Sequence, residues 1–450
     1  MTTAQTQTPT QTPTRTQTAG TGPPTAKPSL WDRRFTLYFT ARAVSLVGDA
    51  MMPVAAALAV GPLYGISGVG LVLGTWTGTF VLLVLFGGVF ADRVGARRMM
   101  VGADLVRVVT QGVLAAAFFA GTPPFWLLVT MAAVAGAAVA MFQPGVNGMV
   151  PLVAREPQRA NATLKVADAL AQLLGPALAG LLIVLTGAGT VYAIDAGTFV
   201  LSALCLGLIR LSPAAASPEA PADTDSTSVS ASVSASAEPS SLRRDLRQGW
   251  REFRSRTWMW AVILIWVAYG VLLFGPMVPL SSAVIGARLG PNAYGLAVSS
   301  LGVGTVLGGL LALRLRPARP LAAGALAMVL FAVLPLCVAL GAGLPVLLAG
   351  HVIGGGAWAF WSVMWATSVQ THTPPDVLNR VTAYELAGSV SGIALGQILA
   401  GPATRLASPT TLLLVSAGTC LAGCAALLSI PAIRTLHRIA RTESTEPSDR

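Results

Sequence analysis

Charged residues are scarce in this chain of 450 residues, because Asp, Glu, Lys and Arg make up only 10% of it while 54% is hydrophobic. Soluble globular domains carry about 25% charged residues. A larger water-soluble core does not explain the deficit, since it would still need a polar surface. A bilayer does explain it, because a membrane-spanning helix needs about 20 mainly apolar residues. The scarcity excludes an ordinary soluble protein.

Cysteine and histidine are also few, at four and three residues. The cysteines lie in apolar segments without metal-ligand spacing, which predicts small buried hydrophobes. The chain has no paired-histidine metal motif, no GxSxG elbow and no GxxxxGK[ST] phosphate loop. We therefore expect no enzymatic activity, no metal and no cofactor. The first apolar segment follows a long polar tail, so we expect no cleavable signal peptide.

Long apolar runs are what the sequence does contain. About twelve are long enough to span a membrane, and most connections between them are short, which favours antiparallel neighbours. The fold class predicted is an all-α membrane protein with twelve transmembrane helices in two six-helix pseudo-repeats. The approximate spans are 36–60, 66–90, 99–121, 125–150, 163–187, 190–210, 258–284, 292–313, 320–341, 344–369, 382–404 and 410–432.

The predicted organisation follows from these runs. Residues 1–34 form a disordered cytosolic tail, 35–211 and 258–432 the two halves, and 433–450 a second cytosolic tail. A low-complexity linker, 212–257, separates the halves. Within it, 242–256 has Leu242, Leu246, Trp250 and Phe253 on one helical face among arginines, which predicts an amphipathic helix on the anionic leaflet. A solvated charged linker is the alternative.

The formal net charge of +11 has a topological explanation. Arginines gather in the tails and in alternate loops, whereas the opposite loops offer only Arg288 and Arg405. By the positive-inside rule both termini are cytosolic, and we expect a multi-pass protein of the plasma membrane. The chain lacks aromatic and basic clusters of the kind that bind nucleic acid, so we expect no nucleic-acid partner.

Two clusters of small residues recur at a single offset. Gly87, Gly88, Ala91 and Arg93 return as Gly308, Gly309, Ala312 and Arg314, and Gly175, Leu178, Ala179 and Gly180 return as Gly396, Leu399, Ala400 and Gly401. Two matches at one offset indicate duplicated halves in the same orientation.

The hairpin after the second apolar run reads GVFADRVGARR, Gly88 to Arg98. Asp92 lies at a helix C-terminus, where the helix dipole disfavours an anion, so it must gain a partner elsewhere. Gly95 suits a turn with positive φ. This stretch resembles the loop 2–3 signature of the major facilitator superfamily, which implies a conformational latch. The latch residues expected are Gly88, Asp92, Arg93, Gly95, Arg97, Asp104 and Arg107.

Further residues resemble the exporter branch of that superfamily, which includes macrolide-efflux and enterobactin-export proteins. They are Ser45, Gly48, Asp49, Asp104, Arg107, Asn161 and Asp195. The run Gly175, Pro176 to Gly180 resembles the superfamily's antiporter motif, with Ala179 in place of a usual glycine. The resemblance implies export by antiport.

Ionisable groups at membrane depth are costly, so each is a functional hypothesis. Asp49 falls near mid-bilayer, and Arg42, Ser45, Asp49 and Met52 share one helical face. Burial opposes ionisation of Asp49 while Arg42 favours it, so we expect proton coupling or cation binding, with a structural ion pair as the alternative. Asp195 is a further coupling candidate or a structural cap. Asp104 and Arg107 are expected to neutralise each other or join the Asp92 hairpin.

Aromatic residues mark a candidate substrate surface. His351, Gly354, Trp358, Trp361 and Trp365 fall on one face of a predicted helix, with two tryptophans mid-span instead of at an interface. That face offers stacking and cation–π contacts, or it packs against lipid or another helix. The full set of cavity candidates is Ser45, Met52, Gln143, Tyr269, Phe274, Met277, His351, Trp358, Trp361 and Trp365.

The function predicted is a proton-coupled secondary exporter of a hydrophobic or amphipathic small molecule, working by alternating access. A lipid flippase, or an importer or facilitator of the same fold, is the alternative. A membrane-embedded enzyme or a sensor is disfavoured, because neither catalytic motifs nor a soluble domain are evident. The partners expected are a small-molecule substrate, protons and the lipid bilayer, with a monomeric chain.

Overall fold

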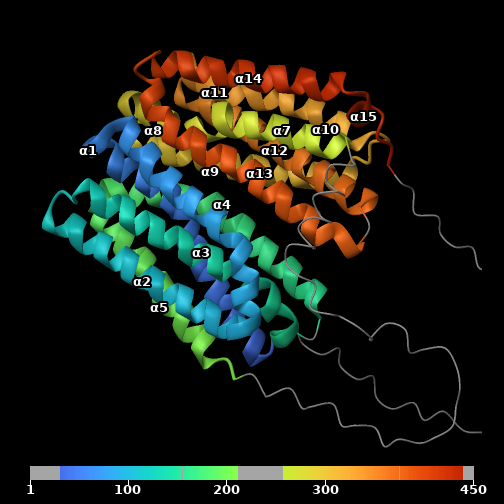
Figure 1. The fold of residues 1–450 in the computed structure, drawn as a ribbon. Helices are drawn as coiled ribbons and strands as arrows, with labels where there is room; N and C mark the ends of the chain where they lie inside the picture. The colour runs from blue at the N-terminus through green and yellow to red at the C-terminus, as the bar shows by residue number, and fades with distance from the viewer. Residues whose placement is uncertain (1–30, 155, 211–256, 374, 439–450) are drawn as a thin grey trace, which may run out of the picture.

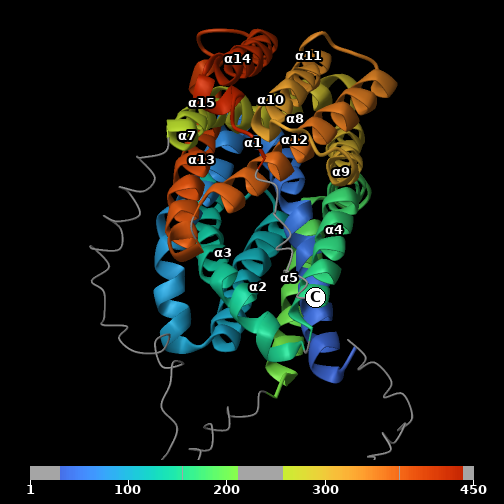
Figure 2. The same cartoon turned by 90° about the vertical axis from the view of Figure 1, so that its right-hand side faces the viewer.

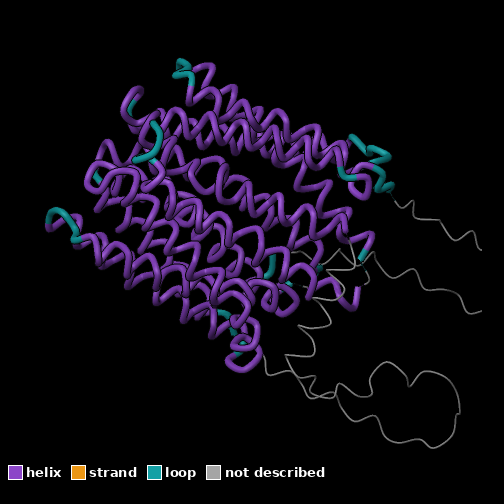
Figure 3. The backbone as a smooth tube through the Cα atoms, turned by 45° about the horizontal axis from the view of Figure 1, so that its top comes forward, coloured by secondary structure: helices purple, strands orange, loops and turns teal. Residues whose placement is uncertain are grey.

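The computed structural model describes residues 31–154, 156–210, 257–373 and 375–438, without the side chains of 85–89, 91–93, 147 and 375–387. The predicted amphipathic helix 242–256 and most of both tails lie outside the described residues. In the described part the backbone consists of helices and short loops (Figure 3).

Five helices form the first half of the chain and the remaining elements the second half. The first are α1 (Arg33–Val94), α2 (Ala96–Ala120), α3 (Phe125–Val153), α4 (Pro157–Thr186) and α5 (Ala188–Leu208). The second are α7 (Thr257–Tyr269), η1 (Gly270–Phe274), α8 (Gly275–Leu289), α9 (Pro291–Arg314), α10 (Pro320–Met328), η2 (Val329–Ala332), α11 (Val333–Ala339), α12 (Leu344–His372), α13 (Pro375–Ala403), α14 (Pro409–Ser429) and α15 (Pro431–Arg434).

Glycine and proline set several of these boundaries. Helix α1 covers the first two predicted spans and bends at Gly65, whose φ of 64° and ψ of −166° are not helical. Gly95, with φ 88°, separates α1 from α2, as its predicted turn role requires. Helices α4, α9, α10, α14 and α15 begin with proline, which fits the first helical position because its missing N–H is not needed there.

Two predicted spans of the second half contain helical turns that are tighter or wider than those of an α-helix. The span 258–284 includes the π-helical segment η1, and the span 320–341 includes the 3₁₀ segment η2. The two segments lie near each other, since the rings of Phe274 in η1 and Phe331 in η2 are 5.4 Å apart.

Ten helical stretches of the described residues are long and apolar enough to cross a membrane. Their outward faces carry exposed leucines, among them Leu82, Leu185, Leu204, Leu264 and Leu326. Apolar surface of that extent is unusual on a soluble monomer and suits contact with lipid. The twelve-helix count and the pseudo-repeat remain predictions.

The two halves of the chain occupy separate layers. In Figure 1 the first half, blue to green, lies beside the second half, yellow to red, and Figure 2 shows the same separation after a quarter turn. Each half has its own buried core: one cluster in the first half includes Phe35, Tyr38 and Phe142, and one in the second includes Trp266, Tyr269 and Trp361.

The halves touch backbone to backbone toward the end of the bundle where α1 bends, here called the Gly65 end. A Cβ on Gly70 of α1 would lie 2.1 Å from the carbonyl oxygen of Gln397 in α13. Gly180 of α4 and Gly295 of α9 also approach closely, because a Cβ on Gly180 would lie 3.1 Å from the Cα of Gly295. Small residues permit such close helix packing in membranes. Thr77 adds a side-chain hydrogen bond, donating to Gln397 Oε1 at 2.8 Å.

Candidate functional site: a buried carboxylate–guanidinium network

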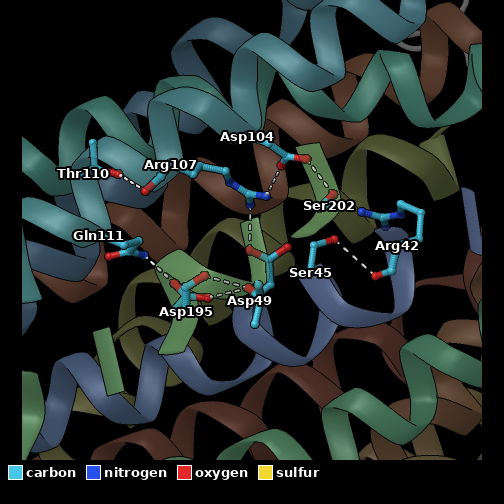
Figure 4. A network of polar contacts seen from close by, with 10 residues as sticks. Arg42, Ser45, Asp49, Asp104, Arg107, Thr110, Gln111, Asp195 and Ser202 are labelled. Atoms are coloured by element: carbon cyan, nitrogen blue, oxygen red, sulfur yellow. Dashed lines mark hydrogen bonds and ion pairs between the residues drawn. The ribbon is translucent and has the colours of Figure 1, made fainter. Parts of the chain in front are cut away.

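Arg107 of α2 is the centre of a polar network inside the first half (Figure 4). Its guanidinium donates to Asp49 Oδ1 of α1 at 2.7 Å and lies 3.7 Å from Asp104 Oδ1. The guanidinium also lies over the rings of Phe199, at 4.3 Å, and Phe142, at 5.3 Å. Burial among aromatic rings strengthens the ion pair by excluding water.

Asp104 is completely buried beside Arg107. Its Oδ2 accepts a hydrogen bond from Ser202 Oγ of α5 at 2.6 Å. Its Oδ1 and the Arg107 Nη1 that faces it have no hydrogen bond, so they meet only through the 3.7 Å ion pair. Asp104 is therefore tied to the network through α5 as well as through its own helix.

Asp195 of α5 is the second fully buried acid of the network. Gln111 Nε2 of α2 donates to its Oδ2 at 2.7 Å. Gly48 of α1 makes room for this carboxylate, because a Cβ there would lie 2.1 Å from Asp195 Oδ1. Hydrogen bonds to neutral groups satisfy Asp195, in contrast to Asp49 and Asp104.

Asp49 is the acid that solvent reaches, since 34% of its side chain is exposed. The cation beside Asp49 is Arg107. The structure corrects the sequence-based prediction of Arg42 in that role. Arg42 lies over the Phe142 ring at 5.2 Å, and Ser45 is buried and donates to the Arg42 carbonyl. The pairing of Asp49 with Arg107 depends on how α1 packs against α2, which sequence spacing does not report.

The net charge of the network is its main chemical property. Asp49 and Asp104 share the Arg107 guanidinium within hydrogen-bond or ion-pair distance, and Asp195 belongs to the same network through Gln111, without an ion pair among the described residues. Buried like charges without cations are strongly disfavoured, so an arrangement of this kind favours uptake of a proton.

Gln111, Thr198 and Ser202 were missed by the sequence analysis. They complete two polar stripes with the same spacing: Asp104, Arg107 and Gln111 on α2, and Asp195, Thr198 and Ser202 on α5. Steps of three and four residues place each set on one helical face. That periodicity, within otherwise apolar helices, is a signal that would have found them.

The expected latch residues divide into two places. Gly88, Asp92 and Arg93 are described only as backbone. Arg97 donates to the carbonyl of Ile209 at the end of α5, while Asp104 and Arg107 lie in the network. The described part of the hairpin is thus tied to α5.

The antiporter-like run of α4 contacts both halves. A Cβ on Gly175 would lie 2.7 Å from Ala50 Cβ of α1, and Gly180 meets Gly295 of α9. Next to Pro176, the backbone N–H of Ala177 donates to Ser299 Oγ of α9 at 2.8 Å. Gly175 and Gly180 therefore permit close helix packing.

The aromatic residues of the second half form a stack that is mostly buried. Trp361 is 2% exposed and stacks on Trp266 at 4.7 Å, and Trp365 follows Trp361 at 6.2 Å. Phe274 and Trp358 are only half-buried and meet edge to face at 5.1 Å. Trp358 is therefore the tryptophan of the predicted aromatic face whose side chain is still partly exposed.

The other cavity candidates differ in accessibility. Tyr269 is buried and donates to the Cys420 carbonyl at 2.7 Å, and His351 is buried with Nδ1 2.8 Å from the Leu347 carbonyl. Met52 and Met277 are half-buried and pack against one shared cluster, while Gln143 is exposed. The structure thus brings the two methionines close to the same core and removes Tyr269 and His351 from solvent.

Comparison with known proteins adds a family to this geometry. The family model described as Major Facilitator Superfamily matches residues 37–396. Macrolide efflux protein A of Streptococcus pyogenes is 25% identical over 186 residues, which are 40% of this chain and 45% of that protein. The match therefore spans less than half of that relative.

Solved transporters share the fold at low sequence identity. The nucleoside transporter NupG has a TM-score of 0.66 at 13% identity, covering 88% of this chain and 98% of that one. A bacterial homologue of the lysosomal transporter Spinster, described as inward-facing and unoccupied, has a TM-score of 0.62 at 14% identity, covering 88% and 94%. The helical fold, the apolar helices and the matched family model together place this chain in the major facilitator superfamily, as a multi-pass membrane transporter and not an enzyme.

Proposed function

We propose that the protein is a secondary active exporter that couples proton entry to removal of a hydrophobic or amphipathic small molecule, such as a drug, an antibiotic or a siderophore. The observation that carries this proposal is the buried network of three carboxylates with one cation, in which Asp49 and Asp104 contact Arg107 and Asp195 is bonded to Gln111. Such a network takes up and releases a proton as its access to water changes. Asp49, the exposed acid, connects it to solvent.

The interface between the halves supports alternating access. Gly70 and Gly180 meet the opposite half at the Gly65 end, which is the outer end if both termini are cytosolic as the arginine distribution predicts. We infer that this form is closed at that end, and that opening separates α1 from α13 and α4 from α9. Residence in the plasma membrane and a monomeric chain are part of the same proposal.

The half-buried side chains of the second half support a hydrophobic substrate. Phe274, Trp358 and Met277 offer aromatic and polarisable surface, and Met52 of α1 packs against the same cluster as Met277. The partial similarity to a macrolide efflux protein supports export. An importer or a lipid flippase of the same fold is the second candidate, favoured by the likeness in fold to a nucleoside transporter.

The test is efflux of a panel of fluorescent dyes and macrolides from cells, with and without a protonophore, by wild type and Asp49→Asn. We expect protonophore-sensitive efflux in the wild type and its loss in the variant. Asp168→Asn is the matched control, because Asp168 is 39% exposed but pairs only with Lys165, at 4.0 Å. Efflux by Asp49→Asn that still responds to the protonophore would remove Asp49 from the coupling path. Wild-type uptake in place of efflux would favour the importer.

A further inference from the structure

Asp195 differs from the other two acids of the network in having no cation of its own. It is 0% exposed, and among the described residues it makes no ion pair. Arg107 is already engaged by Asp49 and Asp104. The titratable side chains near Asp195 are Asp49, Arg107 and Tyr192, which lies one turn earlier on α5 and stacks on Phe118. A carboxylate in this position would be an uncompensated buried charge.

The hydrogen-bond geometry around Asp195 fits a neutral carboxylic acid. Thr198 has one hydroxyl proton, and its short contact, at 2.7 Å, donates that proton to the Asp195 backbone carbonyl. Its contact with Asp195 Oδ1, at 3.4 Å, is much longer and shares the same proton. Gln111 donates to the other oxygen, Oδ2, at 2.7 Å. Oδ2 therefore has a short hydrogen bond from a donor and Oδ1 has only a long, shared one, which leaves Oδ1 as the oxygen that can carry a proton.

Gly48 of α1 packs against Asp195 and directly precedes Asp49, the acid of the network that solvent reaches. Gly48 leaves the space that Asp195 Oδ1 and Thr198 Oγ1 occupy, since a Cβ there would lie 2.1 Å and 2.5 Å from them. Asp49 follows directly in the chain and has 34% of its side chain exposed. Asp49 lies close enough to Asp195 for the two charges to interact, which makes it the candidate acceptor for the proton.

We propose that Asp195 is the proton-binding residue of the transporter, that it holds the proton in this conformation, and that Gln111 is its positioning residue. In the release step the O–H bond of Asp195 breaks, the proton passes to the Asp49 carboxylate, and the negative charge stays on Asp195. The assignment deepens the proposed coupling and rests on it for its role in transport. Occupancy by the proton can be tested without any substrate.

Infrared spectroscopy of the purified full chain in liposomes at neutral pH provides that test. A protonated carboxylic acid has a carbonyl stretching band that a carboxylate lacks. We expect this band in the wild type, in Asp49→Asn and in Asp104→Asn, and its loss in Asp195→Asn, which preserves side-chain size. A band that survives in Asp195→Asn, or that disappears in Asp104→Asn alone, would overturn the assignment.

A second variant tests the positioning role. Gln111→Leu removes the donor to Asp195 Oδ2, so the band should shift to higher frequency without disappearing, and Gln111→Asn should shift it less. An unshifted band in Gln111→Leu would contradict the role of Gln111. Protonophore-sensitive efflux provides the separate readout: insensitivity of the wild type counts against the proposed function, whereas the band alone decides where the proton is bound.

Discussion

The two halves of the molecule stabilise their interiors in opposite ways. The first half buries Asp104, Asp195 and Arg107 in one network. The second half has no Asp or Glu between 257 and 373 or between 388 and 438, and its interior contains the Trp266, Trp361 and Trp365 stack. Buried charge is a weak source of stability, whereas stacked aromatic rings contribute through area and dispersion. In the proposed function the first half carries the proton chemistry and the second half the apolar contacts.

The largest effect is expected from Arg107→Met. The substitution leaves Asp49 and Asp104 without their cation, so we expect loss of transport and a decrease of about 3–5 kcal/mol in the free energy of unfolding. Denaturant unfolding and dye efflux measure the two consequences.

The control for this prediction comes from the second half. Arg288→Met removes only an exposed hydrogen bond, of 2.5 Å, to the Gly341 carbonyl, and should change stability by less than about 1 kcal/mol. Adding Asp49→Asn and Asp104→Asn to Arg107→Met should restore most of the stability but not transport. Equal effects of Arg107→Met and Arg288→Met would erase the contrast between the halves.

The next effect is expected from Trp361→Ala in the aromatic stack. Loss of this buried ring should lower the free energy of unfolding by about 3 kcal/mol, while the transport rate per folded molecule changes little. Trp358→Ala, at the half-buried ring, should do the reverse and weaken competition by aromatic compounds in an efflux assay. If Trp361→Ala alters substrate competition while stability is retained, the stack belongs to the binding surface after all.

A smaller effect is expected where the halves meet. Gly70→Ala forces a Cβ to within 2.1 Å of the Gln397 carbonyl, so it should shift the population away from this conformation by about tenfold, equivalent to about 1.4 kcal/mol. Spin labels at Leu63 and Leu406, with the native cysteines replaced, report the separation of the two halves at the Gly65 end.

Gly78→Ala is the matched control on the same helix. A Cβ there would lie 3.9 Å from Ala394 Cβ, an ordinary contact, so the distance distribution should stay that of the wild type. Indistinguishable distributions for Gly70→Ala and wild type would show that close backbone contact does not determine this conformation.

The smallest effect is expected from Thr77→Val, which removes the donor to the buried Gln397 Oε1. The cost of about 1 kcal/mol should shift the same distance distribution a few-fold toward separated halves. Thr77→Val combined with Gln397→Leu should recover the wild-type distribution, because neither polar group is then left unsatisfied. Thr130→Val, at an exposed hydroxyl bonded within its own helix, should have no effect.

The sequence by itself determined the membrane class, the approximate apolar spans, the turn at Gly95 and the lack of Asp and Glu from 257 to 373 and from 388 to 438. These properties follow from local hydropathy, backbone conformation and composition, which neighbours in the chain specify. Only the tertiary structure decided that Asp49 pairs with Arg107 instead of Arg42, that Gln111 reaches Asp195, and that Trp361 is buried while Trp358 is not. The partner of a buried charge or ring lies on another helix. The rotation and depth at which two helices pack depend on all their contacts together, so sequence spacing within one helix does not specify that partner.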